Sequence, residues 1–139
     1  MIQFLLNREL RREQTLDPNT TVLDYLREYR GKSGTKEGCA EGDCGACTVL
    51  LGRTENNQLH YQPVNACIIP LGTVDSTQVL TVEHLADPQP HPVQLEMAKA
   101  HGSQCGFCTP GIVMSLAALH YACDTDDFTV DHEGLNDAL

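Results

Sequence analysis

The sequence predicts an α+β protein in which a small mixed sheet, crossed by one helix, is followed by a helical segment. Most of residues 1–85 consists of short strand-like runs, with one stretch of helical spacing among them. Beyond residue 92 the apolar residues recur at helical spacing instead. A chain of 139 residues with 41% hydrophobic residues is long enough for one compact domain or two small ones.

The first elements should be a hairpin and a helix. Residues 1–7 and 10–16 are short runs joined by a polar pair, and apolar residues alternate in the first, as in a strand. Residues 17–19, Asp-Pro-Asn, suit a turn and a helix N-cap. The apolar residues that follow at helical spacing are Val22, Leu23, Leu26 and Tyr29, and Gly31 should end this helix.

Further strands are expected at residues 48–51, 58–62 and 78–83, after a glycine-rich stretch without periodicity. Three prolines then fall within residues 86–92, where they remove backbone donors and favour extended geometry. We therefore predict a sheet domain over residues 1–85, a proline-rich linker over 86–92 and a helical domain over 93–139. In the last of these, Thr109 is expected to be an N-cap with Pro110 at the first helical position.

Three of the seven cysteines lie in one Cys-x4-Cys-x2-Cys run, and a fourth follows later. They are Cys39, Cys44, Cys47 and Cys67. This spacing is typical of a [2Fe–2S] cluster, in which each tetrahedral iron carries two bridging sulfides and takes two protein thiolates. Gly42 and Gly45 allow the loop to wrap around such a centre. Structural zinc and unliganded core thiols are the alternatives, although zinc sites usually pair two short cysteine knuckles.

A second pair, Cys105 and Cys108, joins the two expected helices. Alone, such a pair can serve zinc, a dithiol or half of a cluster. Cys108 precedes a helix N-terminus, whose partial positive charge favours a thiolate. Cys123 would lie roughly 20 Å along the helix from Cys108 and cannot share its metal, so we expect it to pack as a small hydrophobe.

The charge and the cysteine content of the sequence indicate which partners and which cellular compartment to expect. The net charge of −10 and pI near 4.8 disfavour nucleic acid and anionic lipid as partners. No basic segment precedes the apolar start, and the longest apolar stretch is far shorter than the ~20 residues of a membrane span. An odd number of cysteines without an export signal argues against a disulfide framework. We expect a soluble, cytoplasmic protein that binds no nucleic acid and no membrane.

Three motifs carry a resemblance to a known family: residues 36–49 around the first cysteines, 65–67 around Cys67, and 101–111 around the second pair. Together they resemble the molybdenum hydroxylases, and within them the iron–sulfur portion of the xanthine dehydrogenases, most nearly the bacterial small subunit. The resemblance spans nearly the whole chain. It implies a ferredoxin-like β-grasp domain followed by a helical-bundle domain, each holding one [2Fe–2S] cluster.

The resemblance also implies a function. In that family two clusters relay electrons from a molybdopterin centre, which hydroxylates a purine or aldehyde carbon, to FAD and then NAD⁺. Cys105 and Cys108 would hold the cluster nearer molybdenum and the Cys39 group the cluster nearer flavin, while Gln104 matches a position that contacts the pterin. The implied partners are a molybdopterin-binding large subunit and an FAD domain in a hetero-oligomer.

One departure from the family lies at the end of the sequence. Relatives complete the second cluster with a Cys-x-Cys motif after the next helix, and this sequence ends at Leu139 before it. We therefore expect a truncated fragment with one complete cluster site, half of another and no substrate-converting site. The alternatives are an iron–sulfur subunit of a related aldehyde, carbon monoxide or N-heterocycle dehydrogenase, a stand-alone ferredoxin-like carrier, and a zinc-stabilised binding module.

Overall fold

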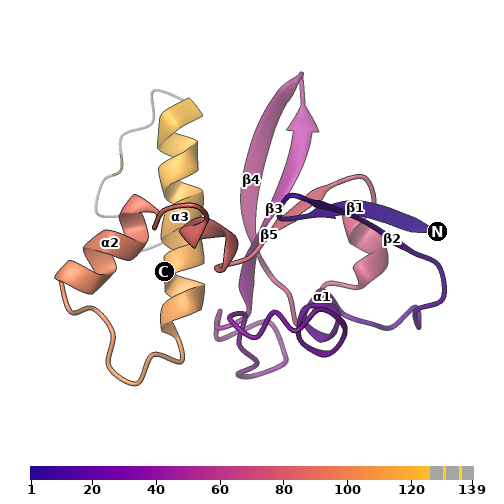
Figure 1. The fold of residues 1–139 in the computed structure, drawn as a ribbon, viewed down its shortest axis with the longest axis horizontal. Coiled ribbons are helices and arrows are strands. Elements are labelled where there is room, and N and C mark those ends of the chain that lie inside the picture. The colour runs from indigo at the N-terminus through magenta and orange to yellow at the C-terminus, as the bar shows by residue number, and fades with distance from the viewer. Residues whose placement is uncertain (126–129, 131–134, 136–139) are drawn as a thin grey trace.

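The structure, a computed structural model, describes residues 1–125, 130 and 135 (Figure 1). Its centre is a five-stranded sheet with the order β2-β1-β5-β3-β4. The strands are β1 (Ile2–Leu6), β2 (Glu9–Glu13), β3 (Thr48–Glu55), β4 (Gln58–Asn65) and β5 (Gln78–Leu80). β5 runs parallel to β1 and antiparallel to β3, so the sheet is mixed, as the sequence predicts.

The expected hairpin is present, with β1 and β2 paired from Ile2↔Glu13 to Leu6↔Glu9. Its tight turn places Asn7 at φ 58°. β3 and β4 form a second, longer hairpin that extends beyond both predicted strands. The prediction ended the second of these strands before Pro63, but β4 is an edge strand, where a residue without a donor is tolerated.

The helix that crosses one face of the sheet is a short α-helix, α1 (Val22–Asp24), that continues into a π-helical turn over Tyr25–Tyr29. Its N-cap is Thr21, which forms a capping box with Asp24. The expected cap within residues 17–19 is therefore wrong, and those residues form only the preceding turn, in which the Asn19 N–H donates to Asp17 Oδ1. Gly31, at φ +63°, follows the end of the helical turn.

Two longer helices, α2 (Pro92–Lys99) and α3 (Thr109–Thr125), make up the second part of the described chain. α3 already begins at Thr109, whose hydroxyl lies 2.7 Å from Ser103 Oγ, so its expected role as N-cap is wrong. None of the helices in the described ranges has both the length and the apolar character that crossing a bilayer requires. The predicted helical domain beyond residue 125 lies outside the described residues except at 130 and 135, and its bounds stay a prediction.

The sheet is covered on both faces. One core lies between the sheet and the first helix, with Phe4, Leu26 and Val49 among its buried residues. The other lies between the sheet and α3, where Leu50 and Met114 are both fully buried. Figure 1 shows α3 standing beside β3 and β4, with α2 outside it. The helical part therefore packs on the sheet through the second of these two cores.

Candidate metal centre

The first cysteine loop lies below the sheet, between the first helix and β3 (Figure 1). It is bent by three residues in the left-handed region, Ala40 at φ 56°, Gly42 at φ +82° and Gly45 at φ +69°. At Gly42 the backbone angle disfavours any side chain, and an added Cβ would also lie 2.6 Å from Cδ1 of the exposed Ile68, which would have to move. The sequence anticipated this requirement for glycine at Gly42 and Gly45.

Backbone donors converge on the sulfur of Cys39. The N–H groups of Cys44, Glu41 and Asp43 donate to Cys39 Sγ over 3.3, 3.5 and 3.3 Å. These hydrogen bonds, with that from Cys44 the strongest, lower the pKa of Cys39 to about 6. The loop thus stabilises a negatively charged sulfur at this position before any metal is present.

The four thiols lie in two pairs. Cys44 hydrogen-bonds to Cys39 through its thiol, and the Cys39 N–H donates to Cys44 Sγ over 3.4 Å. Cys47, which is buried, is hydrogen-bonded to Cys67. Burial, together with the neighbouring Cys67 thiol, raises the pKa of Cys47 to about 11.

Cys67 reaches this loop because the end of β4 is tied to it. Asn65 Nδ2 donates to the Gly42 carbonyl over 2.6 Å, and the Ala66 N–H donates to the Cys47 carbonyl over 3.3 Å. Thr48 holds the other side, since its hydroxyl donates to the Gly45 carbonyl over 2.6 Å. From the sequence, Asn65 belongs to a motif, but no role is predicted for its side chain. The signal that could have indicated one is a side-chain amide directly before Ala66-Cys67.

The paired thiols fit a [2Fe–2S] cluster, which takes two thiolates on each of its two irons. In the described part of the chain, no three His, Cys, Asp or Glu side chains gather closely enough to hold a single metal ion. The donor set is all sulfur, and one sulfur already accepts three backbone hydrogen bonds of the kind that tune such clusters.

The second pair lies directly before α3. Cys105 and Cys108 are exposed free thiols, separated by Gly106 at φ +83°. The Ile112 N–H donates to the Cys108 carbonyl over 3.2 Å, so this loop is continuous with the first turn of the helix. Gln104 is exposed beside Cys105. Cys123, as predicted, is partly buried, and it lines an apolar groove of about 530 Å³ between α2 and α3.

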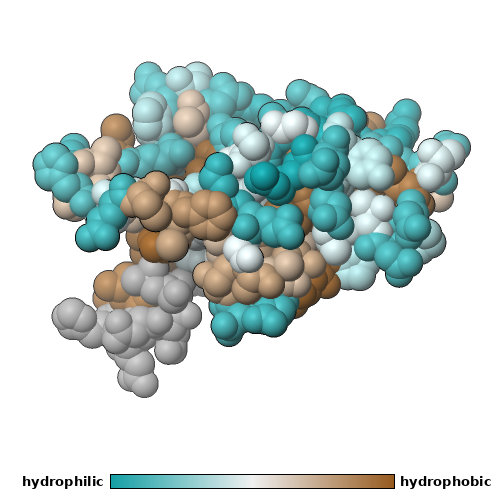
Figure 2. Space-filling view, turned by 90° about the horizontal axis from the view of Figure 1, so that it is seen from below, coloured by the Kyte–Doolittle hydropathy of each residue, from teal (hydrophilic) through white to brown (hydrophobic). Residues whose placement is uncertain are grey.

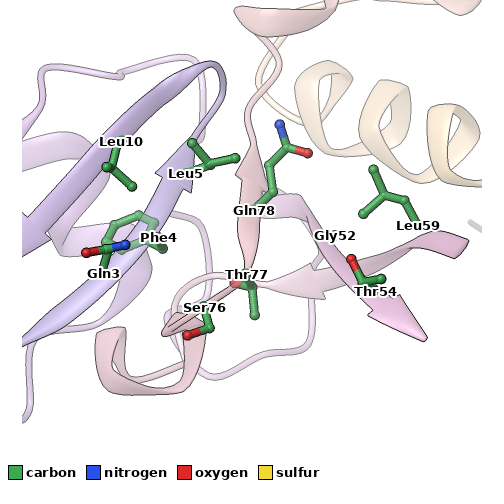
Figure 3. Close-up of a pocket in the computed structure, with 10 residues that line it drawn as sticks. All are labelled: Gln3, Phe4, Leu5, Leu10, Gly52, Thr54, Leu59, Ser76, Thr77 and Gln78. Carbon is green, nitrogen blue, oxygen red and sulfur yellow. The ribbon is translucent and has the colours of Figure 1, made fainter. Parts of the chain in front are cut away.

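A hollow of about 480 Å³ lies elsewhere on the sheet, along β1, β3 and β5 (Figure 3). Its lining has no ionisable side chain: Gln3, Phe4, Leu5, Leu10, Gly52, Thr54, Leu59, Ser76, Thr77 and Gln78. It therefore offers neither acid–base nor metal chemistry, and the cysteine loops stand as the chemical centre of the described residues.

Two family models match the chain. Residues 6–72 match the 2Fe-2S iron-sulfur cluster binding domain, and residues 81–134 match the [2Fe-2S] binding domain. The fold and the thiol pairs thus define a protein with two iron–sulfur domains, a ferredoxin-like domain followed by a helical one.

Curated relatives indicate which proteins with these two domains the chain is similar to. The chain is 48% identical over 121 residues to the xanthine dehydrogenase of Blastobotrys adeninivorans, and 49% identical over 120 residues to the xanthine dehydrogenase/oxidase of Rattus norvegicus. These matches cover 85% and 84% of this chain but 9% of each relative. The chain therefore corresponds to about a tenth of their length.

Solved structures agree. The aldehyde oxidoreductase from Desulfovibrio desulfuricans superposes with a TM-score of 0.79 at 32% identity, over 99% of this chain and 14% of that one. Quinoline 2-oxidoreductase from Pseudomonas putida 86 gives 0.69 at 25% identity, over 99% and 88% of the two chains. The chain belongs to the molybdenum hydroxylase family, as its iron–sulfur portion.

Proposed function

We propose that this chain is the electron-transfer portion of a molybdenum hydroxylase of the xanthine dehydrogenase type. The observation that carries the proposal is the arrangement of the first cysteine loop: two thiol pairs, with three backbone donors on the Cys39 sulfur. Thiolates at all four positions, Cys39, Cys44, Cys47 and Cys67, would hold one [2Fe–2S] cluster.

A [2Fe–2S] cluster, when bound, accepts and releases one electron at a time. The chain supplies the means to hold it. Cys39 and Cys44 form one pair at the exposed side of the loop, while Cys47 and Cys67 form the other against the core. The backbone N–H groups on Cys39 would favour the more negative, reduced state of the site by hydrogen bonding to its sulfur.

Cys105 and Cys108 would supply half of the ligands of a second cluster. A complete site needs two further thiolates, which the described residues do not place beside this pair. In the whole enzyme we propose that this second site faces the molybdopterin centre, with Gln104 near the pterin, and that the Cys39 site faces the flavin.

The partners of the chain then follow from the reaction. Hydroxylation of a purine carbon with oxygen from water releases two electrons and two protons for each product molecule. We propose that the two electrons pass singly through the clusters to an FAD domain and then to NAD⁺. A molybdopterin-binding subunit, a hetero-oligomeric assembly and a reducing, cytoplasmic setting belong to this proposal, which the free thiols support.

An aldehyde as substrate is the second candidate, because the chain superposes closely on an aldehyde oxidoreductase. The sequence identity favours the first candidate, since the chain is 48% identical to a xanthine dehydrogenase and 32% identical to that aldehyde oxidoreductase. The sequence of the molybdenum-binding partner would distinguish the two.

The test is a metal analysis of anaerobically purified protein. We expect two irons and two acid-labile sulfides per chain, with a visible spectrum that bleaches on reduction with dithionite. Cys67→Ser should lose the iron, while Cys123→Ser, also a partly buried thiol, should keep it. Zinc without sulfide, or iron that survives Cys67→Ser but not Cys123→Ser, would refute the proposed site.

A further inference from the structure

The first turn of α3 lies directly on the first cysteine loop. A Cβ built on Gly111 would lie 2.1 Å from the Gly45 carbonyl oxygen, 3.0 Å from its carbon and 3.1 Å from Ala46 Cα. No side chain can approach backbone atoms this closely, so glycine is required here by contact, although its φ is ordinary for a helix. The backbones of the two metal-binding segments meet at this point.

A second contact joins the same two loops. Phe107, which lies between Cys105 and Cys108, is about half exposed. Its Cε1 atom would lie 3.8 Å from a Cβ built on Gly38, at the start of the first cysteine loop. The two loops therefore approach each other at two points, at Phe107 before Cys108 and at Gly111 after it.

The Gly45 side of the contact is held in place. Its carbonyl accepts hydrogen bonds from the Thr48 N–H over 3.0 Å and from the Thr48 hydroxyl over 2.6 Å. The neighbouring Ala46 carbonyl accepts one from the Lys36 N–H over 3.2 Å. Thr48 is itself buried, so the peptide cannot retreat without breaking buried hydrogen bonds.

The Gly111 side is equally constrained. Val113, Met114 and Ala117, in the two turns that follow, are almost completely buried against Leu50 and Leu80 of the sheet. Withdrawal of α3 from the loop would open a gap in this packing. Because the Ile112 N–H is bonded to the Cys108 carbonyl, any movement of the first turn also moves Cys108.

We propose that Gly111 is a positioning residue that fixes the separation of the two cysteine loops through its contact with the Gly45–Ala46 peptide. This role rests on the function proposed above, in which one electron passes from a reduced cluster at one loop to an oxidised cluster at the other, with no bond formed or broken. Electron transfer slows steeply with distance, so the contact sets the gap that each electron crosses.

The experiment measures the separation directly. In a Cys105→Ser, Cys123→Ser background, the first cluster is assembled so that its four thiols are occupied, a Gd³⁺ spin label is then attached to Cys108, and the cluster is reduced with dithionite. Pulsed EPR then gives the distance between the cluster and the label. In Gly111→Ala the loops must separate by about 1 Å or more to restore ordinary contact, so we expect a longer or broader distance distribution than in the parent.

Gly72→Ala is the matched control, because a Cβ at Gly72 would meet nothing within 4 Å. Its distance distribution should equal that of the parent. An unchanged distribution in Gly111→Ala, or an equal change in Gly72→Ala, would overturn the proposal.

If Gly111→Ala does not fold, the double variant Gly111→Ala, Thr48→Val tests the contact instead. Removal of the Thr48 hydroxyl donor lets the Gly45 carbonyl tilt away from the added methyl group. Recovery of folding supports the proposal, and failure of both variants overturns it.

Absence of a visible cluster spectrum in the parent would count against the proposed function alone. In that case proton NOEs between Gly111 and Ala46 in the metal-free chain test the contact, and their absence would refute it.

Discussion

At the scale of single residues, the first cysteine loop gives chemically identical thiols opposite character. The Cys39 sulfur accepts hydrogen bonds from three backbone N–H groups, which lower its pKa to about 6, whereas burial raises the pKa of Cys47 to about 11. Eight residues apart, one thiol is prepared as an anion and the other is kept neutral until a metal displaces its proton.

This difference predicts the reactivity of the metal-free chain. At pH 7 about nine-tenths of Cys39 would be thiolate, but only about one in ten thousand of Cys47. Alkylation followed by peptide mass spectrometry should modify Cys39 with a midpoint near pH 6 and leave Cys47 unmodified. A midpoint for Cys39 near the ordinary thiol value of about 9 would contradict the hydrogen-bonded geometry.

The same shift links stability to pH. Because the pKa of Cys39 is lower in the folded chain than its ordinary value, its contribution to folding is fully present above about pH 9 and is lost as the pH falls through about 6. Cys39→Ser in the metal-free chain should remove this dependence.

Glu83 joins the loop region to the start of the helical part, since the Gly34 N–H donates to its Oε1 over 2.9 Å. Burial alone would raise the pKa of this carboxyl, but hydrogen bonds from Thr81, its own backbone N–H and Gly34, together with nearby Lys32, bring it below the ordinary value. Its stabilising effect is therefore present above about pH 4.5 and is lost at lower pH.

Glu83→Gln should accordingly lower the free energy of unfolding by about 1 kcal/mol at pH 7, because the charge-assisted bond becomes a neutral one. The difference from the parent should shrink as urea unfolding is repeated down to pH 3. Exposed Glu55→Gln is the control and should have almost no effect at either pH. A difference that persists unchanged at pH 3 would show that the charge is not responsible.

At the scale of elements, α2 depends on its cap because none of its residues is fully buried. His91 Nδ1 accepts from the Val93 N–H over 3.3 Å, and the Gln94 side chain accepts from the His91 N–H over 3.0 Å. The His91 ring lies edge-on to His120, with 4.9 Å between centroids. Burial first, and then His120, lower the pKa of His91, while Asp124 opposes them.

Protonation would remove the acceptor that caps α2. With the pKa of His91 below 6.5 in the folded chain, stability is complete above about pH 6.5 and decreases as the pH falls further. His91→Asn keeps a good cap that does not titrate, so its melting temperature should change less between pH 7.5 and 5.5 than that of the parent. His60→Asn should retain the parent's pH dependence, and an equal pH dependence in His91→Asn would argue against the cap.

At the scale of the whole molecule, the sheet is the shared support of both metal-binding segments. Adjacent residues of β3 serve opposite faces, Val49 and Leu51 in the first core and Leu50 in the core with α3. Unfolding of the helical part would expose Leu50, so we expect one cooperative transition for the described fold.

Met114→Ala tests this coupling, because Met114 has no exposed surface. Truncation should cost about 2–5 kcal/mol and shift the whole urea transition, seen by both far-UV circular dichroism and tyrosine fluorescence. Leu95→Ala, at a side chain of α2 that is 44% exposed, should cost much less. Two separate transitions, with only one of them moved by Met114→Ala, would show that the parts fold independently.

Several features followed from the sequence alone because their causes are local. The spacing of Cys39, Cys44 and Cys47, the glycines between them and the alternation in β1 all act within a few residues, and each predicted feature is present in the structure. The early start of α3 and the length of β4 were not predicted, because the Ser103 contact and the edge position of β4 are tertiary features. The Thr21 cap was a local signal, since its partner Asp24 lies three residues away, and the sequence analysis missed it.

Only the tertiary structure decided how the two cysteine loops meet. The sequence shows Gly111 as one more glycine near a helix start, and Thr48 as an ordinary strand residue. The burial of α3 against Leu50 brings Gly111 onto the Gly45 carbonyl, which Thr48 holds in place. Sequence spacing determines which side chains can bind a metal, whereas the distance between two such sites depends on packing between residues far apart in the chain.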